Sequence, residues 1–166
     1  WGCDEETTPW GFTGQYATRV CYFWTQAGIP QIYICPELNY GAAVHADKWI
    51  PVLPNTDAAL QLAIIYTWIK EGTWKKDYVK THAVGMEYIE NYVLGKDDGI
   101  PKTPEWASRI TGVPSGVIKR IAREYATTKP AMLYQGYGMQ RRAFGEQPVR
   151  AGCVLAAITG NVGIHG

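Results

Sequence analysis

KWIPVLPNTDAALQLAIIYTWIKEG, residues 48–72, is the stretch that decides the fold. It opens with a short run suited to a β-strand, residues 48–52, which contains and precedes prolines. A helix is predicted over residues 57–72, because apolar side chains occupy most of its faces and Thr56 or Asn55 can cap it. Such a helix is normally buried, so the stretch predicts a strand followed by a helix packed against a sheet.

The segments around this stretch repeat the alternation of strand and helix. Residues 13–28 have apolar side chains at helical spacing, and residues 31–35 form a β-rich run that ends at a proline. Residues 131–134 are predicted to be a buried strand, and a strand that precedes the first helix would end at residues 1–3. Helices are also predicted at residues 76–81, from 103 onward, at 114–127 and at 146–159, whereas residues 86–104 are expected to be exposed around a charged loop.

This order predicts an α/β fold, a doubly wound, mostly parallel sheet with helices on both faces. The chain begins at Trp1 without a methionine and stops at Gly166 in a glycine-rich turn, so we interpret residues 1–166 as one segment of a larger multidomain subunit. In a sheet of this kind, ligands bind at the carboxyl ends of the strands. The loops that follow the strands are therefore the candidate site.

Composition excludes several classes of function. Hydrophobic residues make up 46% of the chain and charged residues 19%, as in soluble globular proteins rather than disordered ones. The net charge is +1 without a basic block, which argues against a nucleic-acid partner. No apolar run reaches the roughly 18 residues of a membrane span, so no direct membrane contact is expected.

The cysteines and histidines give no sign of a metal site. The cysteines form no C-x-x-C pair, so an iron–sulfur cluster or zinc ion held by this segment alone is not expected. Their apolar surroundings favour buried free thiols. The histidines lie far apart in the sequence, and His45 is interpreted as a hydrogen-bonded structural residue. The residues concerned are Cys3, Cys21, Cys35 and Cys153, with His45, His82 and His165.

The first candidate loop, residues 2–9, carries groups suited to a phosphate or a sugar. Gly2 allows a ligand to approach the backbone, and Asp4, Thr7 and Thr8 offer acceptors and hydroxyl groups. The same residue types also occur where a helix begins, so capping of the following helix is an equally physical interpretation.

Two further loops follow predicted strands. Asp57 could accept two N–H bonds from the edge of a guanine, or could complement the dipole of the helix that it begins. Gly136 and Gly138 allow close backbone contact with a flat or phosphorylated ligand, and Gln140 can both donate and accept. A G-x-G pattern alone is weak because it lacks the third glycine of the nicotinamide fingerprint. Residues 141–142, two arginines, could neutralise a pyrophosphate or could be solvated.

In their order along the chain, these motifs resemble the dimethyl sulfoxide reductase family of molybdopterin oxidoreductases. The resemblance covers essentially the whole chain and is more specific than any one motif. The matching stretches are WGCDEETT at 1–8, ADKWIPVLPNTDAAL at 46–60, TPEWA at 103–107, TGVP at 111–114, the helix at 118–126, GYGMQ at 136–140 and ITGNVG at 158–163.

The resemblance implies that the segment holds part of a cofactor in which Mo or W is bound by two molybdopterin guanine dinucleotides. It implies no metal ligand and assigns no catalytic residue within this segment. Cys35 replaces the usual acid of one turn, where Glu37 can compensate, and Asn55 replaces the usual glycine of another. The dinucleotide-binding residues that it implies are Gly2, Cys3, Asp4, Thr7, Thr8, Cys35, Pro36, Glu37, Pro54, Asn55, Asp57, Gly136, Gly138 and Gln140.

Within the family, residues 4–8, 35–37 and 40–47 most resemble the pyrogallol–phloroglucinol transhydroxylase and catechol dehydroxylase group. This implies hydroxyl transfer or reductive dehydroxylation of a small phenolic substrate. The expected partners are the remaining domains of the same subunit and an iron–sulfur electron-transfer subunit, with the cytoplasm as the favoured compartment. The alternatives are another oxidoreductase of the family and a nucleotide-binding α/β module without metal.

Overall fold

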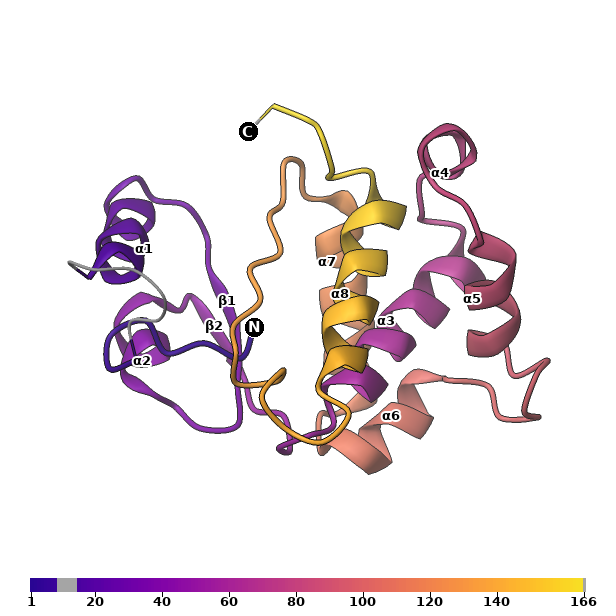
Figure 1. Ribbon diagram of the computed structural model, residues 1–166, viewed down its shortest axis with the longest axis horizontal. Coiled ribbons are helices and arrows are strands. Elements are labelled where there is room, and N and C mark those ends of the chain that lie inside the picture. The colour runs from indigo at the N-terminus through magenta and orange to yellow at the C-terminus, as the bar shows by residue number, and fades with distance from the viewer. Residues whose placement is uncertain (9–14, 166) are drawn as a thin grey trace.

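The computed structural model describes residues 1–8 and 15–165. It is a helix-rich α/β structure with a small parallel sheet (Figure 1). Among the described residues, every helix is too short or too polar to cross a membrane. The elements are α1 (Tyr16–Gln26), β1 (Ile32–Ile34), α2 (Tyr40–His45), β2 (Lys48–Ile50), α3 (Asp57–Glu71), α4 (Lys76–His82), α5 (Met86–Val93), α6 (Pro104–Thr111), α7 (Ser115–Thr127) and α8 (Glu146–Thr159).

Most predicted elements are confirmed, with ends shifted by a few residues. The predicted strands at 31–35 and 48–52 are β1 and β2, which pair in parallel with Tyr33 opposite Trp49. The helix predicted over residues 13–28 is α1, although its expected beginning falls partly on residues 9–14, outside the described part of the chain. The helix predicted from residue 103 is α6, and the Thr103 side chain caps it by accepting from the Trp106 N–H.

The sheet is smaller than predicted, since β1 and β2 are its two strands among the described residues. Two extended segments continue it through a few backbone hydrogen bonds. Gly2 donates its backbone N–H to Ile34, the Trp1 nitrogen donates to Tyr134, and Gly136 donates to Trp1. A proline at position 36 has no N–H with which to extend the first of these contacts. A doubly wound sheet therefore remains a prediction.

The buried strand predicted at residues 131–134 is wrong. This segment is extended but not assigned as a strand, and Met132 is 67% exposed. Trp1 donates its backbone nitrogen to the Tyr134 carbonyl, at the end of this segment. Successive side chains of an extended segment point to opposite faces, so Met132 is exposed while Leu133 packs against the core, which the apolar letters of the segment do not reveal.

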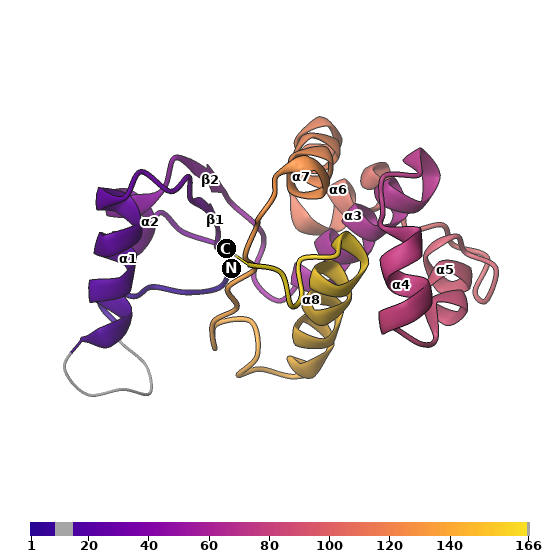
Figure 2. The ribbon, with the colours of Figure 1, turned by 90° about the horizontal axis from the view of Figure 1, so that it is seen from above.

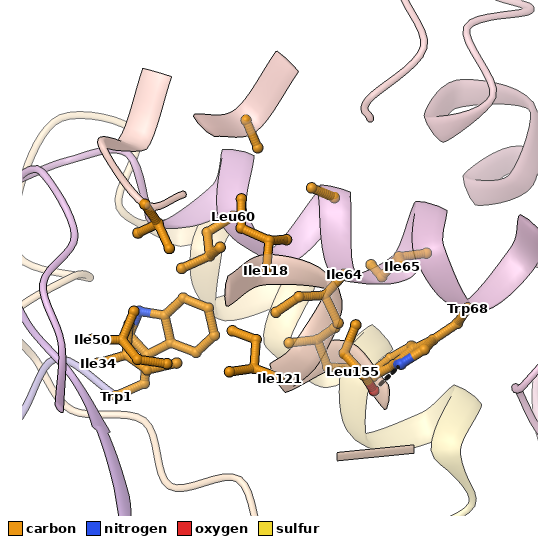
Figure 3. Packing of buried hydrophobic residues seen from close by; sticks show 14 of the residues in the cluster. Trp1, Ile34, Ile50, Leu60, Ile64, Ile65, Trp68, Ile118, Ile121 and Leu155 are labelled. Atoms are coloured by element: carbon orange, nitrogen blue, oxygen red, sulfur yellow. Dashed lines mark hydrogen bonds between the residues drawn. The ribbon is translucent and has the colours of Figure 1, made fainter. Parts of the chain in front are cut away.

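Helices lie on both sides of the extended segments. Figures 1 and 2 place α1 and α2 on one side, with α3, α7 and α8 on the other. The prediction that α3 packs against a sheet needs correction, because α3 contacts α5, α6, α7 and α8. Its fully buried residues include Leu60, Ile65 and Trp68, and the Trp68 indole donates to the Ala122 carbonyl at 2.6 Å (Figure 3). Helix α3 is thus apolar on most sides because other helices surround it.

The start of α3 also differs from the prediction. Neither Thr56 nor Asn55 caps the helix with its side chain, and the Thr56 hydroxyl instead donates to the Leu53 carbonyl at 2.6 Å. Asn55 has φ 68°, in the left-handed region that asparagine tolerates better than most residues. The substitution of asparagine for glycine at this turn is therefore compatible with its backbone.

Residues 86–104 are not an exposed segment as predicted. They contain α5, and Lys102 is only 2% exposed. Its ammonium group donates to Asp98 and to the Ile100 carbonyl, and lies 4.4 Å from the centre of the Tyr92 ring. A charged residue can be buried in this way because each of its donors has a partner. The charged loop at residues 96–99 is exposed as expected, as are Tyr88 and Ile100, so the prediction holds for part of the segment.

Replacement of Lys102 by methionine removes these contacts while keeping most of the apolar stem. We expect the free energy of unfolding to fall by about 1–3 kcal/mol, measured by chemical denaturation. Lys119→Met is the matched control, because its ion pair with Glu105 is exposed and should contribute less than about 1 kcal/mol. Equal losses for the two variants would show that the burial of Lys102 contributes nothing.

Candidate functional site

One cleft of about 280 Å³ lies where the first loop, the turn after β1, the start of α3 and the turn after residue 136 meet. Four segments that are distant in sequence therefore share it. Its lining residues are Gly2, Cys3, Asp4, Thr8, Cys35, Pro36, Glu37, Asn39, Asp57, Tyr137, Gly138, Met139 and Arg142.

Most of the residues predicted from the sequence line this cleft, and five do not. Thr7 lies beside the cleft and holds Asp4, whereas Pro54, Asn55 and Gln140 are exposed outside it. Gly136 is buried beneath it. The loops at strand ends thus converge as the sequence predicts, but not with every predicted side chain.

Asp57 is a nearly buried acid that lines the cleft. It is 6% exposed, and its Oδ1 accepts a 2.7 Å hydrogen bond from the Trp1 indole N–H. Among the described residues, no backbone N–H donates to its carboxylate. The capping interpretation therefore has no hydrogen bond to support it, and the carboxylate faces the cleft from the first turn of α3.

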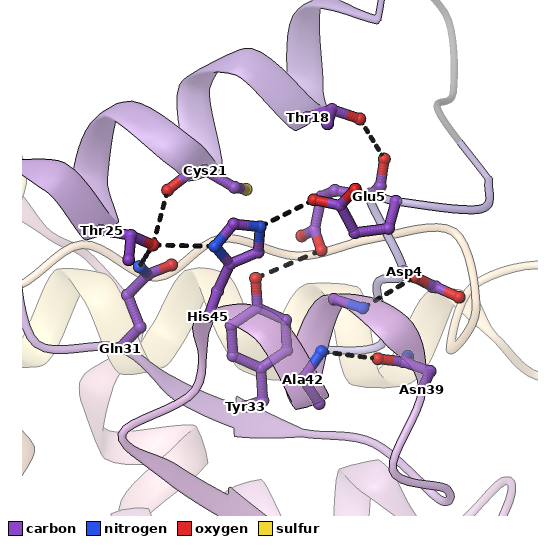
Figure 4. Close-up of polar contacts among 12 residues, drawn as sticks. Asp4, Glu5, Thr18, Cys21, Thr25, Gln31, Tyr33, Asn39, Ala42 and His45 are labelled. Atoms are coloured by element: carbon purple, nitrogen blue, oxygen red, sulfur yellow. Dashed lines mark hydrogen bonds and ion pairs between the residues drawn. The ribbon is translucent and has the colours of Figure 1, made fainter.

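The first loop is fastened to α2 by its own polar groups. Asp4 accepts from the Gly41 N–H at 3.1 Å with one oxygen and from the Thr7 hydroxyl with the other. Asn39 donates to the Cys3 carbonyl at 2.8 Å and caps α2 by accepting from the Ala42 N–H (Figure 4). Asp4 and Thr7 therefore shape the loop, so that fewer of their groups face a ligand than the sequence suggests.

Buried acids support the loop from behind. Glu5 is 2% exposed and accepts from the Tyr33 hydroxyl at 3.4 Å (Figure 4). His45 lies between Glu6, 2.7 Å from its Nε2, and Thr25, 2.8 Å from its Nδ1. Both ring nitrogens of His45 are thus engaged, which confirms the structural interpretation of this residue. Desolvation by burial and the nearby Glu5 charge raise the pKa of Tyr33, so its phenol remains a hydrogen-bond donor.

The cysteines at the cleft are thiols rather than thiolates. Burial raises the pKa of Cys3 to about 12, and its Sγ lies 3.4 Å from the Trp1 carbonyl. Burial also raises the pKa of Cys35, whose Sγ lies 3.2 Å from the Glu37 carbonyl. Within residues 1–8 and 15–165, no group of three or more His, Cys, Asp or Glu side chains could hold a metal ion. Cys153 is exposed on α8, contrary to the expectation of burial for all four cysteines.

The two glycines of the 136–138 turn are required for close packing against the first loop. A Cβ on Gly136 would lie 2.5 Å from the Gly2 carbonyl oxygen and would overlap the Cys3 sulfur. A Cβ on Gly138 would lie 2.7 Å from the same oxygen. The glycines therefore let this turn approach the first loop, and only Gly138 also borders the cleft.

Four lining residues were absent from the predicted set. Arg142 was considered only as half of an arginine pair, and it donates to the Gly138 carbonyl at 2.6 Å. It is the one basic side chain among the described residues that line the cleft, opposite the acids Asp4, Glu37 and Asp57. Asn39 could have been found as a capping residue, but the short helix α2 was not predicted. For Tyr137 and Met139, the sequence offered no indication of a place in the cleft other than their position within the glycine turn.

This donor and acceptor set fits one part of a pterin–guanine dinucleotide. A nearly buried carboxylate matches the paired N–H groups of guanine, and a single guanidinium matches a phosphate. A volume of about 280 Å³ lies just below the roughly 300–1,000 Å³ of typical ligand pockets. The cleft is therefore large enough for a portion of the dinucleotide and not for all of it.

Comparisons with known proteins agree on one family. The molybdopterin oxidoreductase family model matches residues 12–166. Dimethyl sulfoxide reductase of Haemophilus influenzae is 43% identical over 81% of this chain and 18% of its own length, and that of Escherichia coli is 41% identical over 94% and 21%. The pyrogallol hydroxytransferase large subunit of Pelobacter acidigallici is 39% identical over 83% and 16%.

A solved structure agrees with the sequence relatives. Acetylene hydratase from Pelobacter acetylenicus superposes with a TM-score of 0.73 and 29% identity, over 83% of this chain and 18% of the other. The chain thus spans about a fifth of the length of the curated relatives that it matches.

The glycine turn provides a test of how the cleft is built. We expect Gly136→Ala to lower the free energy of unfolding by about 1–3 kcal/mol, because the new methyl group would overlap the first loop. Gly116→Ala is the control, since nothing lies within 4 Å of a Cβ there and alanine favours the interior of α7 by about 0.5–1 kcal/mol. Denaturant unfolding measures both, and a Gly136 variant as stable as the unsubstituted protein would contradict the packing described.

Proposed function

Because the chain belongs to the molybdopterin oxidoreductase family, we propose that its cleft binds the guanosine end of a molybdopterin guanine dinucleotide. The observation that carries this proposal is the Asp57 carboxylate, which is nearly buried, caps no helix and opens on the same cleft as Gly138 and Arg142. The bound cofactor supplies the redox or oxygen-transfer chemistry.

Each wall of the cleft has a distinct part in this proposal. Asp57 accepts N–H groups from the guanine edge, and the charge strengthens these bonds. Glu37, exposed at the turn after β1, accepts from ribose hydroxyls in place of the acid that Cys35 replaces. Arg142 and Thr8 face the phosphates, and Gly138 lets the backbone of its turn come close to the ligand.

Other parts of the complete protein complete the active site in this proposal. In this proposal two dinucleotides bind one metal ion, Mo or W. The site of the second dinucleotide, the protein ligand of the metal and the groups that act on substrate would lie outside this segment. An iron–sulfur partner subunit and a cytoplasmic location are proposed on the family resemblance alone.

For the substrate, we propose a small phenol that undergoes hydroxyl transfer or reductive dehydroxylation. The motifs at residues 4–8, 35–37 and 40–47 support this, together with the 39% identity to a pyrogallol hydroxytransferase subunit. Reduction of an S-oxide or N-oxide is the second candidate, favoured by the 43% and 37% identities to a dimethyl sulfoxide reductase and a trimethylamine-N-oxide reductase.

Asp57→Ala tests the cofactor site in the complete protein. It removes a charge-assisted pairing worth about 1.5–3 kcal/mol, so we expect roughly tenfold or greater loss of bound dinucleotide while the protein stays folded. Guanine nucleotide released by acid, counted per polypeptide together with Mo and W, measures the occupancy.

Asp77→Ala is the matched control, because Asp77 lies in the first turn of α4, outside the cleft. Unchanged occupancy in the Asp57 variant would overturn the proposal. Recovery of NAD or ATP from the unsubstituted protein, without GMP or metal, would favour the nucleotide-binding module that lacks a metal.

A substrate panel separates the two candidate reactions. With the holoenzyme and an artificial electron donor or acceptor, we expect turnover of polyhydroxylated phenols to exceed turnover of dimethyl sulfoxide and trimethylamine N-oxide by at least about tenfold, the effect of roughly 1.4 kcal/mol in barrier height. Product analysis by chromatography measures both classes, and faster turnover of the oxides would replace the phenolic proposal with the second candidate.

A further inference from the structure

Trp1 connects the Asp57 carboxylate, which lines the cleft, with the segment that leads into the glycine turn. Its indole N–H donates to Asp57 at 2.7 Å, its backbone nitrogen donates to the Tyr134 carbonyl at 2.8 Å, and its carbonyl accepts from the Gly136 N–H at 2.9 Å. The side chain is 9% exposed and packs in the main core beside Ile34 (Figure 3). The residue thus connects the start of α3 with the glycine turn on the opposite wall.

We propose that Trp1 is a positioning residue for cofactor binding, which acts by fixing the Asp57 carboxylate in the orientation that the ligand requires. The inference rests on the proposed function, because it assumes that Asp57 contacts the cofactor. It goes further because it assigns the orientation of the Asp57 carboxylate to Trp1, a residue that does not line the cleft.

The physical reason begins with the freedom of the aspartate side chain. Rotation about its last bond is broad, so an unrestrained carboxylate presents its two oxygens to a ligand in many orientations. A hydrogen bond from a buried, immobile donor restricts this rotation before the ligand arrives, and lowers the entropy lost on binding. Trp1 is suited to this because its ring is held by the core and by two backbone hydrogen bonds.

The chemical nature of the donor also matters. An indole N–H is neutral and offers one hydrogen, so it leaves the negative charge of Asp57 uncompensated. A lysine or arginine at the same place would form an ion pair with Asp57 and weaken its attraction for donors on a ligand. With Oδ1 sharing one of its lone pairs with Trp1, the remaining acceptor sites of both oxygens stay available to a ligand with two adjacent N–H groups.

A purely structural role for Trp1 is the competing explanation. In that case the hydrogen bond would merely satisfy a buried donor, and its loss would lower stability without a specific effect on the cofactor. Trp68 provides the comparison, because its fully buried indole N–H donates to a backbone carbonyl within the helical core. The two tryptophans differ mainly in what their N–H groups hold.

The test compares Trp1→Phe, Asp57→Ala, the double variant and Trp68→Phe in the complete holoprotein. Phenylalanine keeps an aromatic ring in the core and removes the N–H. The readouts are the rate at which guanine nucleotide dissociates, followed by acid release from protein retained on a filter, and the thermal unfolding temperature. We expect Trp1→Phe to accelerate dissociation roughly tenfold, as for loss of one hydrogen bond to a charged group, and the double variant to be no worse than Asp57→Ala alone.

Trp68→Phe should lower the unfolding temperature and leave dissociation unchanged. An unchanged rate in Trp1→Phe, or effects that multiply in the double variant, would overturn the proposal, because Trp1 would then act independently of Asp57. If Asp57→Ala itself has no effect on dissociation, the proposed function fails first, and the two failures are thereby distinguished.

Asp57→Glu keeps the test decisive should Trp1→Phe fail to fold. Glutamate preserves the charge but carries it one methylene farther from the indole N–H. We expect this variant to release nucleotide about as fast as Asp57→Ala, whereas release at the unsubstituted rate would show that the position fixed by Trp1 is unimportant.

Discussion

The structure depends on the hydrogen bonds that hold residues 1–3 between β1 and the 134–138 segment. These bonds run from Gly2 to Ile34 on one side and between Trp1, Tyr134 and Gly136 on the other. They align the ends of all the extended segments at one rim, where the cleft lies. Without them, the two halves of the molecule seen on either side of the strands in Figures 1 and 2 would share fewer contacts.

The close approach that these bonds require explains the glycines better than ligand contact does. A side chain on Gly136 or Gly138 would meet the Gly2 carbonyl before it met anything in the cleft. Acids of the first loop also hold it in place. Asp4 and Glu6 fix it to Gly41 and His45, and Asp4 borders the cleft as well.

Some polar groups near the cleft hold the fold together, and others remain available to a ligand. The acids of the first loop have backbone, hydroxyl or histidine partners, whereas the one hydrogen-bond donor to Asp57 among the described residues is a neutral indole. Protonated thiols at Cys3 and Cys35 add bulk without charge. Arg142 brings the one positive charge into the lining described, close to the turn of Gly138. A ligand with an N–H-rich edge at one end and a phosphate at the other matches this distribution.

The sequence by itself determined the local elements and the family. Apolar spacing and caps located α3, α6, α7 and α8, because such signals depend only on residues within a few turns of one another. It also indicated that the loops after the strands meet. Only the tertiary structure decided which face each side chain takes: that Lys102 is buried, that residues 131–134 lie at an open edge, that Gln140 turns away from the cleft and that Trp1 holds Asp57. The contacts of Trp1 join residues that lie tens of positions apart, and those of Lys102 depend on how a short loop folds back, and local sequence patterns contain no information about either.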